Sequence, residues 1–225
     1  MTRRVILLLL LAFAFIASLV AGKVWISPAD WFADNVDGWI MADLRLPRAI
    51  LGASIGAVLG LSGAVLQGYL RNPLADPTVV GVSSSAALGG VVAILLGVSG
   101  LAMFGFAMAG AAISVALLVA LAGRSGGPLG FILAGMVLAT LSGSLTALLI
   151  SLAPNPFATS EIVTWLMGAL TDRTIDDVWR ALPFMAVGSA VLLFTGRSLD
   201  ALTLGEEAAK NLSVEDGKRS PVELY

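Results

Sequence analysis

Long apolar stretches separated by short polar segments recur along almost the whole chain. A helix needs about 20 mostly apolar residues to cross the hydrocarbon core of a bilayer. Six stretches meet that requirement, at residues 5–22, 47–66, 78–97, 101–122, 129–152 and 178–196. The pattern predicts an all-α protein, a polytopic transmembrane helical bundle of about six spanning helices.

The first apolar stretch also has an alternative interpretation. It follows Arg3 and Arg4 and ends at the small residues Val20-Ala21-Gly22, which would suit a cleaved signal peptide. Its apolar run is longer than the usual core of a signal peptide. We therefore expect a retained membrane span.

The distribution of Lys and Arg predicts the orientation of the bundle. With the N-terminus in the cytoplasm, eight basic residues fall on the cytoplasmic side and five on the outer side. Short cytoplasmic loops of membrane proteins carry the excess of Lys and Arg. The sequence thus favours a multi-pass protein of the bacterial inner membrane with a cytoplasmic N-terminus.

Two shorter helices are predicted between and after the spans. One begins at Thr159 or Ser160 and ends near Leu170, followed by a capping box at 174–177. It is too short to span and is expected at the outer, periplasmic surface. The other, 202–212, has apolar residues at helical spacing and is expected as an amphipathic cytoplasmic helix.

Composition narrows the chemistry that the chain can perform. Hydrophobic residues make up 58% and charged residues 12%, with no Cys and no His. Cys and His chemistry is therefore excluded, and the interiors of the predicted spans hold no Asp or Glu either, so we expect no catalytic residue, no metal site and no enzyme. The basic residues are scattered, so nucleic acid is not an expected partner, whereas membrane lipid is.

Small residues recur every four positions in the second predicted span. Gly52, Gly56 and Gly60 start this series, which continues at Ala64 and Gly68. On a helix of about 3.6 residues per turn such a series forms a slowly drifting stripe. Stripes of small residues let membrane helices approach closely. We interpret it as helix packing rather than as a substrate contact.

Arg45 and Arg48 bracket the start of the same span. Arginines at a helix end usually extend toward lipid headgroups, and composition alone favours that interpretation. The alternative is a positive patch for a partner with carboxylates, because a guanidinium forms bidentate, charge-assisted pairs. Three residues apart, the two side chains share a helix face if the helix begins that early.

After this span, Asn72-Pro-Leu-Ala-Asp-Pro77 predicts a rigid turn. Each proline removes a donor and favours extended backbone in the residue before it. Asn72, Pro73 and Pro77 are therefore expected to shape the chain on the cytoplasmic side.

Four motifs together resemble a known family. They are WISPADWF at 25–32, RLPR at 45–48 with the glycine stripe, NPLADP at 72–77 followed by GVSSSAALGG, and LGEEAAKNL at 204–212. In sequence and spacing they resemble permease subunits of FecCD-type, binding-protein-dependent ABC importers for iron-siderophore complexes, haem and vitamin B12. The resemblance covers nearly all of residues 5–212.

The resemblance implies a set of partners. These are a second permease subunit, in a homo- or heterodimer, two cytoplasmic ATPases, and a periplasmic or lipid-anchored substrate-binding protein. Arg45 and Arg48 match positions that dock the binding protein. A stretch in the coupling region 199–212 matches the helices that fit into the ATPase, with these residues at its centre: Leu204, Gly205, Glu206, Glu207 and Ala208. No cofactor is implied, because the chain has no GxxxxGK[ST] motif and ATP would be bound by the partner.

The resemblance also implies a pathway. The loop 124–130 corresponds to the inner gate, and the fifth span and the helix at 165–169 lie along the route of the substrate. The fifth span offers a polar and soft lining without ionisable groups, from these residues: Met136, Thr140, Ser142, Ser144 and Thr146. Because no carboxylate lies in mid-membrane, ATP rather than a proton gradient is the expected energy source.

The family has about ten spanning helices, so residues 1–212 correspond to the N-terminal part of the permease domain. The tail 213–225 is polar where a seventh span is expected. The expected function is movement of an iron chelate, a siderophore complex or haem, across the inner membrane. The alternatives are a vitamin B12 permease subunit and a non-transporting structural membrane fragment.

Overall fold

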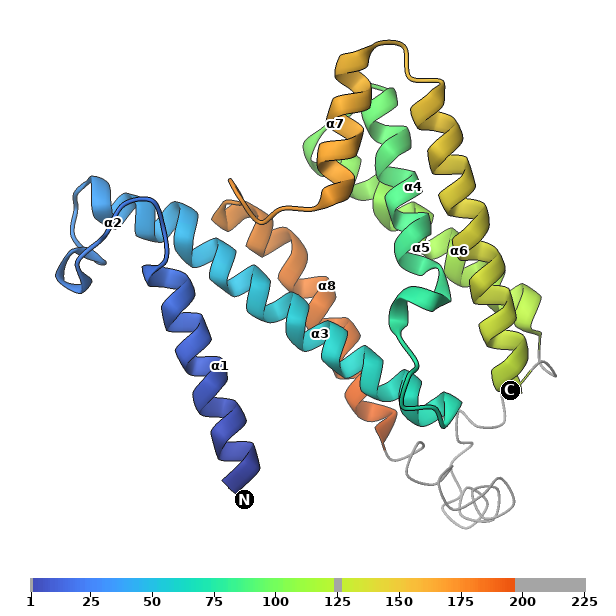
Figure 1. Cartoon of the computed structure of the whole chain (residues 1–225), viewed down its shortest axis with the longest axis horizontal. Coiled ribbons are helices and arrows are strands. Elements are labelled where there is room, and N and C mark those ends of the chain that lie inside the picture. The colour runs from blue at the N-terminus through green and yellow to red at the C-terminus, as the bar shows by residue number, and fades with distance from the viewer. Residues whose placement is uncertain (1, 124–126, 197–225) are drawn as a thin grey trace. The chain divides into compact units, whose positions relative to one another are not determined.

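The computed structural model describes residues 2–123 and 127–196, and all regular structure within these ranges is helical (Figure 1). The predicted all-α bundle is thus confirmed. The longer helices are α1 (Thr2–Val20), α3 (Leu46–Leu70), α4 (Val82–Leu95), α5 (Gly100–Ala122), α6 (Gly127–Ser151), α7 (Pro156–Met167) and α8 (Ile175–Phe194). Short turns of helix join them: η1 (Pro28–Asp30), α2 (Val36–Ile40), η2 (Met41–Arg45) and η3 (Pro77–Val80).

The contacts divide the chain into two compact units. Unit 1 comprises residues 1–61 and 169–193, with α1, α2, η2, the first part of α3 and most of α8. Unit 2 comprises Ser62–Gly168 and, among the later described residues, 194–196. The end of α3 and helices α4 to α7 belong to unit 2. Each unit has its own buried apolar cluster.

Helix α4 is the centre of unit 2. It packs against α5, α6 and α7, and α5 also packs against α6 (Figure 1). Val91 of α4 and Ile162 of α7 are completely buried and share a cluster with Ile94. A second cluster joins Leu118 of α5 to α6. The short helix α7 is therefore fastened to the bundle by its own apolar side chains.

Five helical segments in the described ranges are long and apolar enough to cross a membrane, and the third predicted span is not among them. Where 78–97 was expected, the chain forms η3 and then α4, which has 14 residues. A helix of that length measures about 21 Å, against about 30 Å for the hydrocarbon core. The helix begins after Gly81, whose φ is +79°, and ends at Leu95, two residues before Gly97, whose φ is +68°.

Glycines set the distance between the helices of unit 2. A Cβ on Gly89 would collide with the carbonyl oxygen of Phe106, and one on Gly110 with that of Ser85. Gly90 in turn lies beneath the indole ring of Trp165. Backbone atoms cannot turn aside as a side chain can, so the close approach of α4 and α5 requires glycine at 89 and 110.

The glycine stripe of α3 has few neighbours within the described chain. Only Gly52 has a neighbour there, the side chain of Leu170, at 3.5 Å from the Cβ it would carry. Positions 56 and 60 face open space. The packing role of the stripe stays a prediction, whereas α4 and α5 do approach each other closely at Gly89 and Gly110.

Polar side chains cap the N-terminal ends of α7 and α8. Asn155 caps α7 by accepting a hydrogen bond of 2.9 Å from the amide of Ala158, so this helix starts three residues before the predicted Thr159. In α8 the carboxylate of Asp177 accepts from the amide of Thr174 at 3.2 Å, as a capping box requires. Pro183 lies in the interior of α8, which begins at Ile175.

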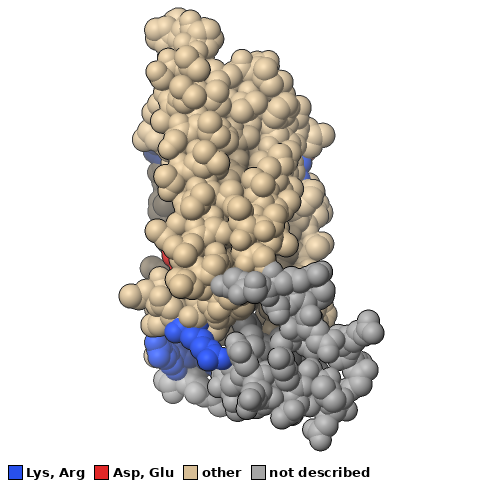
Figure 2. All heavy atoms as spheres, turned by 90° about the vertical axis from the view of Figure 1, so that its right-hand side faces the viewer, with Lys and Arg blue, Asp and Glu red and all other residues tan. Residues whose placement is uncertain are grey.

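The surfaces of the long helices are predominantly apolar. Figure 2 shows a face with few charged side chains over the described residues. Leu101, Val119 and Leu129 are among the large apolar side chains that α5 and α6 leave exposed. Exposure of so much apolar area to water would be unfavourable, whereas contact with lipid or neighbouring helices would not.

Glycine substitutions in α5 test the packing of unit 2. Gly110→Ala should destabilise the chain by roughly 1–3 kcal/mol, because the new methyl group meets the backbone of α4. Gly105→Ala is the matched control in the same helix, since nothing lies within 4 Å of its Cβ position, and it should be neutral or stabilising by roughly 1 kcal/mol. Equilibrium unfolding in mixed micelles measures both. Equal effects would contradict the assigned packing.

Candidate functional site

Arg45 and Arg48 lie together beside the C-terminal end of α1. Arg45 is only 5% exposed and donates hydrogen bonds to the carbonyl oxygens of Leu19 (3.0 Å), Val20 (2.9 Å) and Val24 (2.5 Å). Arg48 is half-buried and donates to the carbonyl oxygens of Ser18 (2.8 Å) and Ala21 (3.1 Å). We name the two arginines and these five carbonyl groups the arginine clamp.

The helix that carries both arginines begins earlier than the sequence predicted. Pro47 was expected to start the second span, but α2, η2 and α3 form one continuous helical segment from Val36 to Leu70. Immediately before Pro47 the helix widens to a π turn, in which the amide of Leu46 donates to the carbonyl of Met41. Arg45 and Arg48 therefore share a face, as the alternative interpretation required.

An apolar cluster lies next to the arginine clamp. Leu19 of α1, Met41 of η2 and Ala49 of α3 are buried together, and Trp31 packs against them. The indole of Trp31 is thus directed into the protein, whereas Trp25 and Trp39 are more than 70% exposed. Exposed tryptophans of this kind suit the headgroup region of a membrane.

At the other end of α3 the predicted turn is closed by side chains. The amide oxygen of Asn72 accepts from the backbone N–H of Leu74 at 2.9 Å. Asp76 accepts from both the backbone N–H and the hydroxyl of Thr78, and these bonds lower the pKa of its carboxyl group. A lowered pKa means that the bonds are present at neutral pH and are lost only as the pH falls through that pKa.

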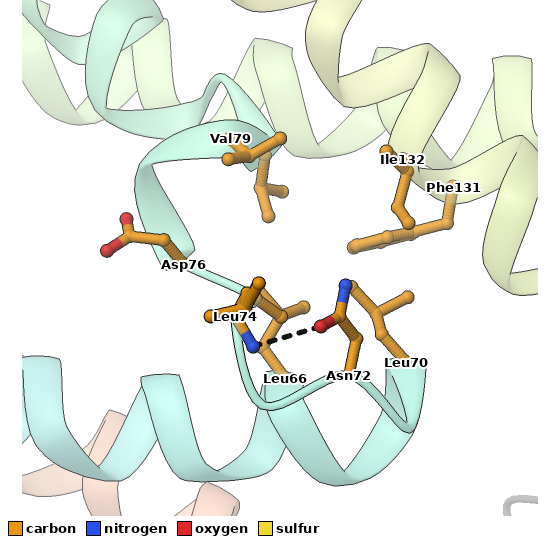
Figure 3. Close-up of a pocket in the computed structure, with 10 residues that line it drawn as sticks. Leu66, Leu70, Asn72, Leu74, Asp76, Val79, Phe131 and Ile132 are labelled. Atoms are coloured by element: carbon orange, nitrogen blue, oxygen red, sulfur yellow. Dashed lines mark hydrogen bonds between the residues drawn. The ribbon is translucent and has the colours of Figure 1, made fainter.

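A cavity of about 130 Å³ lies beside this turn (Figure 3). Its wall is mainly apolar, with Leu66, Leu70, Val79, Phe131 and Ile132 directed toward it. The rings of Tyr69 and Phe131 meet edge to face, with centroids 5.7 Å apart. The cavity is about the size of one apolar side chain and holds no cluster of groups that could perform chemistry.

The polar residues of the fifth predicted span divide between two faces of α6. Ser142 does not line an open face: it is buried, and its hydroxyl is 2.7 Å from that of Ser85 on α4. Met136, Thr140 and Ser144, spaced by four residues, are exposed. The hydroxyl of Thr140 donates a hydrogen bond of 2.9 Å to the backbone carbonyl oxygen of Met136. This bond reduces the polarity of that face.

The expected coupling residues 204–208 lie outside the described residues, as does the start of the loop at 124–130. Sequence reasoning considered Gly22 only as part of a possible signal-peptide end, but this glycine lies against the guanidinium of Arg45. Only contact between residues far apart in the chain identifies that glycine.

The sequence profile of the FecCD transport family matches residues 9–218. The chain belongs to the FecCD transport family. The match covers nearly the whole chain and confirms the resemblance carried by the four motifs.

Individual relatives agree with this assignment. The cobalamin import system permease protein BtuC of Halobacterium salinarum is 43% identical over 78% of this chain and 48% of its own length. The uncharacterized ABC transporter permease protein YvrB of Bacillus subtilis is 36% identical over 80% of this chain and 53% of its own. The “Probable siderophore transport system permease protein YfiZ” of Bacillus subtilis is 31% identical over 79% and 54%.

A solved structure gives the same result for the fold. It is described as “An inward-facing conformation of a putative metal-chelate type ABC transporter” and matches with a TM-score of 0.83 at 33% identity. The match covers 92% of this chain and 66% of that one. The chain spans about half the length of the curated relatives it matches.

Proposed function

We propose that the chain contributes to the transmembrane permease subunit of a binding-protein-dependent ABC importer in the bacterial inner membrane. The observation that carries this proposal is the family match over residues 9–218, supported by a fold similar to that of a metal-chelate transporter. Energy would come from ATP bound by separate cytoplasmic subunits. A second permease subunit and an external substrate-binding protein would complete the assembly.

The described helices suit a route for a bulky, pre-assembled chelate. Met136, Thr140 and Ser144 give α6 an exposed face that has soft and weakly polar groups but no charge. A charged lining would bind the polar periphery of such a cargo, whereas this face offers no strong partner to hold it. The helix α7, fastened to α4 by Ile162 and Trp165, would border the route at the outer side.

The docking of the binding protein is assigned to the outer end of α3. Arg45 is buried in the arginine clamp, so we place the contact with a partner carboxylate at Arg48, whose side chain is only half-buried. A guanidinium with some donors in use can still form a charge-assisted pair with its remaining N–H groups. Arg45 would then support the contact without making it.

Two substrates fit the proposal. The first candidate is an iron chelate, which is either a siderophore complex or haem. The description of YfiZ as a probable siderophore transport protein agrees with it. Cobalamin is the second, favoured by the 43% identity to the cobalamin import permease of Halobacterium salinarum. Both are large metal chelates that arrive already wrapped.

Charge reversal in the coupling region tests the proposed partnership with an ATPase. Glu206→Arg/Glu207→Arg should abolish co-purification of the co-expressed cognate ATPase. Two negative side chains that are proposed to contact the ATPase would become positive. Asp172→Arg, a charge reversal of one residue in the loop before α8, is the control and should leave co-purification unchanged. Retention of the ATPase by the double variant would count against the transporter assignment.

A charge reversal at the outer end of α3 tests the docking assignment. Arg48→Glu should weaken the affinity of the cognate binding protein for the chain in nanodiscs by roughly tenfold or more, because a paired charge becomes repulsive. Lys23→Glu changes the same amount of charge in a neighbouring exposed loop and should have a much smaller effect. Surface plasmon resonance gives both affinities. If the two variants lost equal affinity, Arg48 would have no specific role.

Uptake by a knockout strain decides between the substrates. We expect the loss of the gene to abolish accumulation of a radiolabelled ferric siderophore or haem and to leave cobalamin accumulation intact. Unlabelled cobalamin should then fail to compete with the iron chelate in the parent strain. The opposite pattern would assign the chain to cobalamin import.

A further inference from the structure

The last four carbonyl groups of α1 all have hydrogen-bond partners, and arginines supply three of them. Helix α1 ends at Val20, so the carbonyls of residues 17–20 have no partner in the regular pattern of the helix. The carbonyl of Ala17 accepts from the amide of Ala21 at 2.8 Å. Arg48 donates to the carbonyl of Ser18, and Arg45 donates to the carbonyls of Leu19 and Val20.

This arrangement provides hydrogen-bond partners both for the last carbonyl groups of α1 and for the guanidinium of Arg45. A backbone carbonyl without a partner is strongly unfavourable in an apolar environment. A buried guanidinium is equally costly unless its donors find acceptors. The negative end of the α1 dipole adds a favourable interaction with the positive charge. Arg45 continues past the helix to the carbonyl of Val24, so it also ties the loop that follows α1.

The position of Arg45 follows from the π turn in the helix that carries it. Pro47 has no backbone N–H, so the regular bond to the carbonyl four residues earlier cannot form. The helix is widened over Met41–Arg45. A π turn contains one more residue than an α turn, and such turns are often found at functional sites. In this chain the widened turn ends at Arg45, whose side chain reaches α1.

Gly22 supplies the space in which the guanidinium of Arg45 lies. A Cβ at position 22 would lie 2.5 Å from Nη2, 2.8 Å from Cζ and 3.1 Å from Nε of that side chain. The backbone of Gly22 is not among the positive-φ glycines of the described chain, so conformation alone does not require glycine there. A methyl group at position 22 would therefore require the guanidinium of Arg45 to shift from its three carbonyl partners.

We propose that Arg45 is a positioning residue. Seated against Gly22, it closes the C-terminal end of α1 and fixes that end to the start of α3. In doing so it holds Arg48 beside the neighbouring carbonyl groups of Ser18 and Ala21. The proposal rests on the geometry of unit 1 and holds whether or not the chain docks a binding protein.

A double-mutant cycle between positions 22 and 45 tests the proposal. The chain has no cysteine, so Phe13→Cys/Trp39→Cys introduces the only two labelling sites, at side chains that are 71% and 72% exposed in α1 and α2. Spin labels at these positions report the distance between the two helices in nanodiscs. No ATPase or binding protein is present, so failure of the proposed transport function would not affect the result.

The distance distribution should be narrow in the parent and broad in Arg45→Gln, because a shorter neutral side chain cannot serve three carbonyl groups. Gly22→Ala should also broaden it, since the methyl group displaces the guanidinium. The double variant Gly22→Ala/Arg45→Gln should be no broader than Arg45→Gln alone. Gly56→Ala, which introduces a methyl group into open space in the same unit, should leave the distribution narrow.

Three results would overturn the proposal. They are an unchanged distribution in Arg45→Gln, an unchanged distribution in Gly22→Ala, and additive broadening in the double variant. If Arg45→Gln cannot be purified in folded form, the comparison of Gly22→Ala with Gly56→Ala decides, because both retain Arg45. Equal distributions in those two variants would show that the guanidinium does not need the space at Gly22.

Discussion

A helix that ends beside an apolar phase must still provide partners for its last carbonyl groups, and the part of unit 1 around the end of α1 is organised around this constraint. The last turn of α1 contains no basic residue that could donate to the carbonyls of residues 18–20. Arg45 and Arg48 do so from a helix more than 20 residues further along the chain. The loop after α1, the π turn and the start of α3 are positioned by the same hydrogen bonds.

Other helix ends in the chain solve the same problem locally. Asn155 caps α7, and Asp177 returns a carboxylate to the amide of Thr174 at the start of α8. Asp76 does the same for the short helix η3. These are inexpensive solutions because each side chain lies two or three residues from the group it serves, so little chain must be ordered. The clamp at α1 orders much more of the chain and correspondingly connects more of it.

Close packing rather than hydrogen bonding determines the geometry of unit 2. With apolar surroundings on all sides, membrane helices gain little from burying apolar area against one another, so contact depends on how closely the backbones approach. Gly89 and Gly110 permit that approach between α4 and α5, and the hydroxyls of Ser85 and Ser142 join α4 to α6. This packing leaves the face at Met136, Thr140 and Ser144 exposed.

The local properties of the sequence were sufficient for the helical bundle, for its family and for most helix positions. Apolar length, proline, glycine and capping residues act over a few neighbouring positions, and four motifs in the right order are specific enough to indicate a family. The span expected at 78–97 was wrong in length because Gly81 interrupts an apolar run that composition alone treats as continuous.

What only the tertiary structure decided is the environment of individual side chains. The stripe at Gly52, Gly56 and Gly60 is regular in sequence, yet the glycines that helices approach most closely lie elsewhere, because packing depends on which neighbour each face meets. Arg45 and Arg48 are equivalent in the sequence, but only Arg45 is buried. That difference arises from carbonyl groups and a glycine 21 to 26 residues away, a separation over which no local pattern carries information.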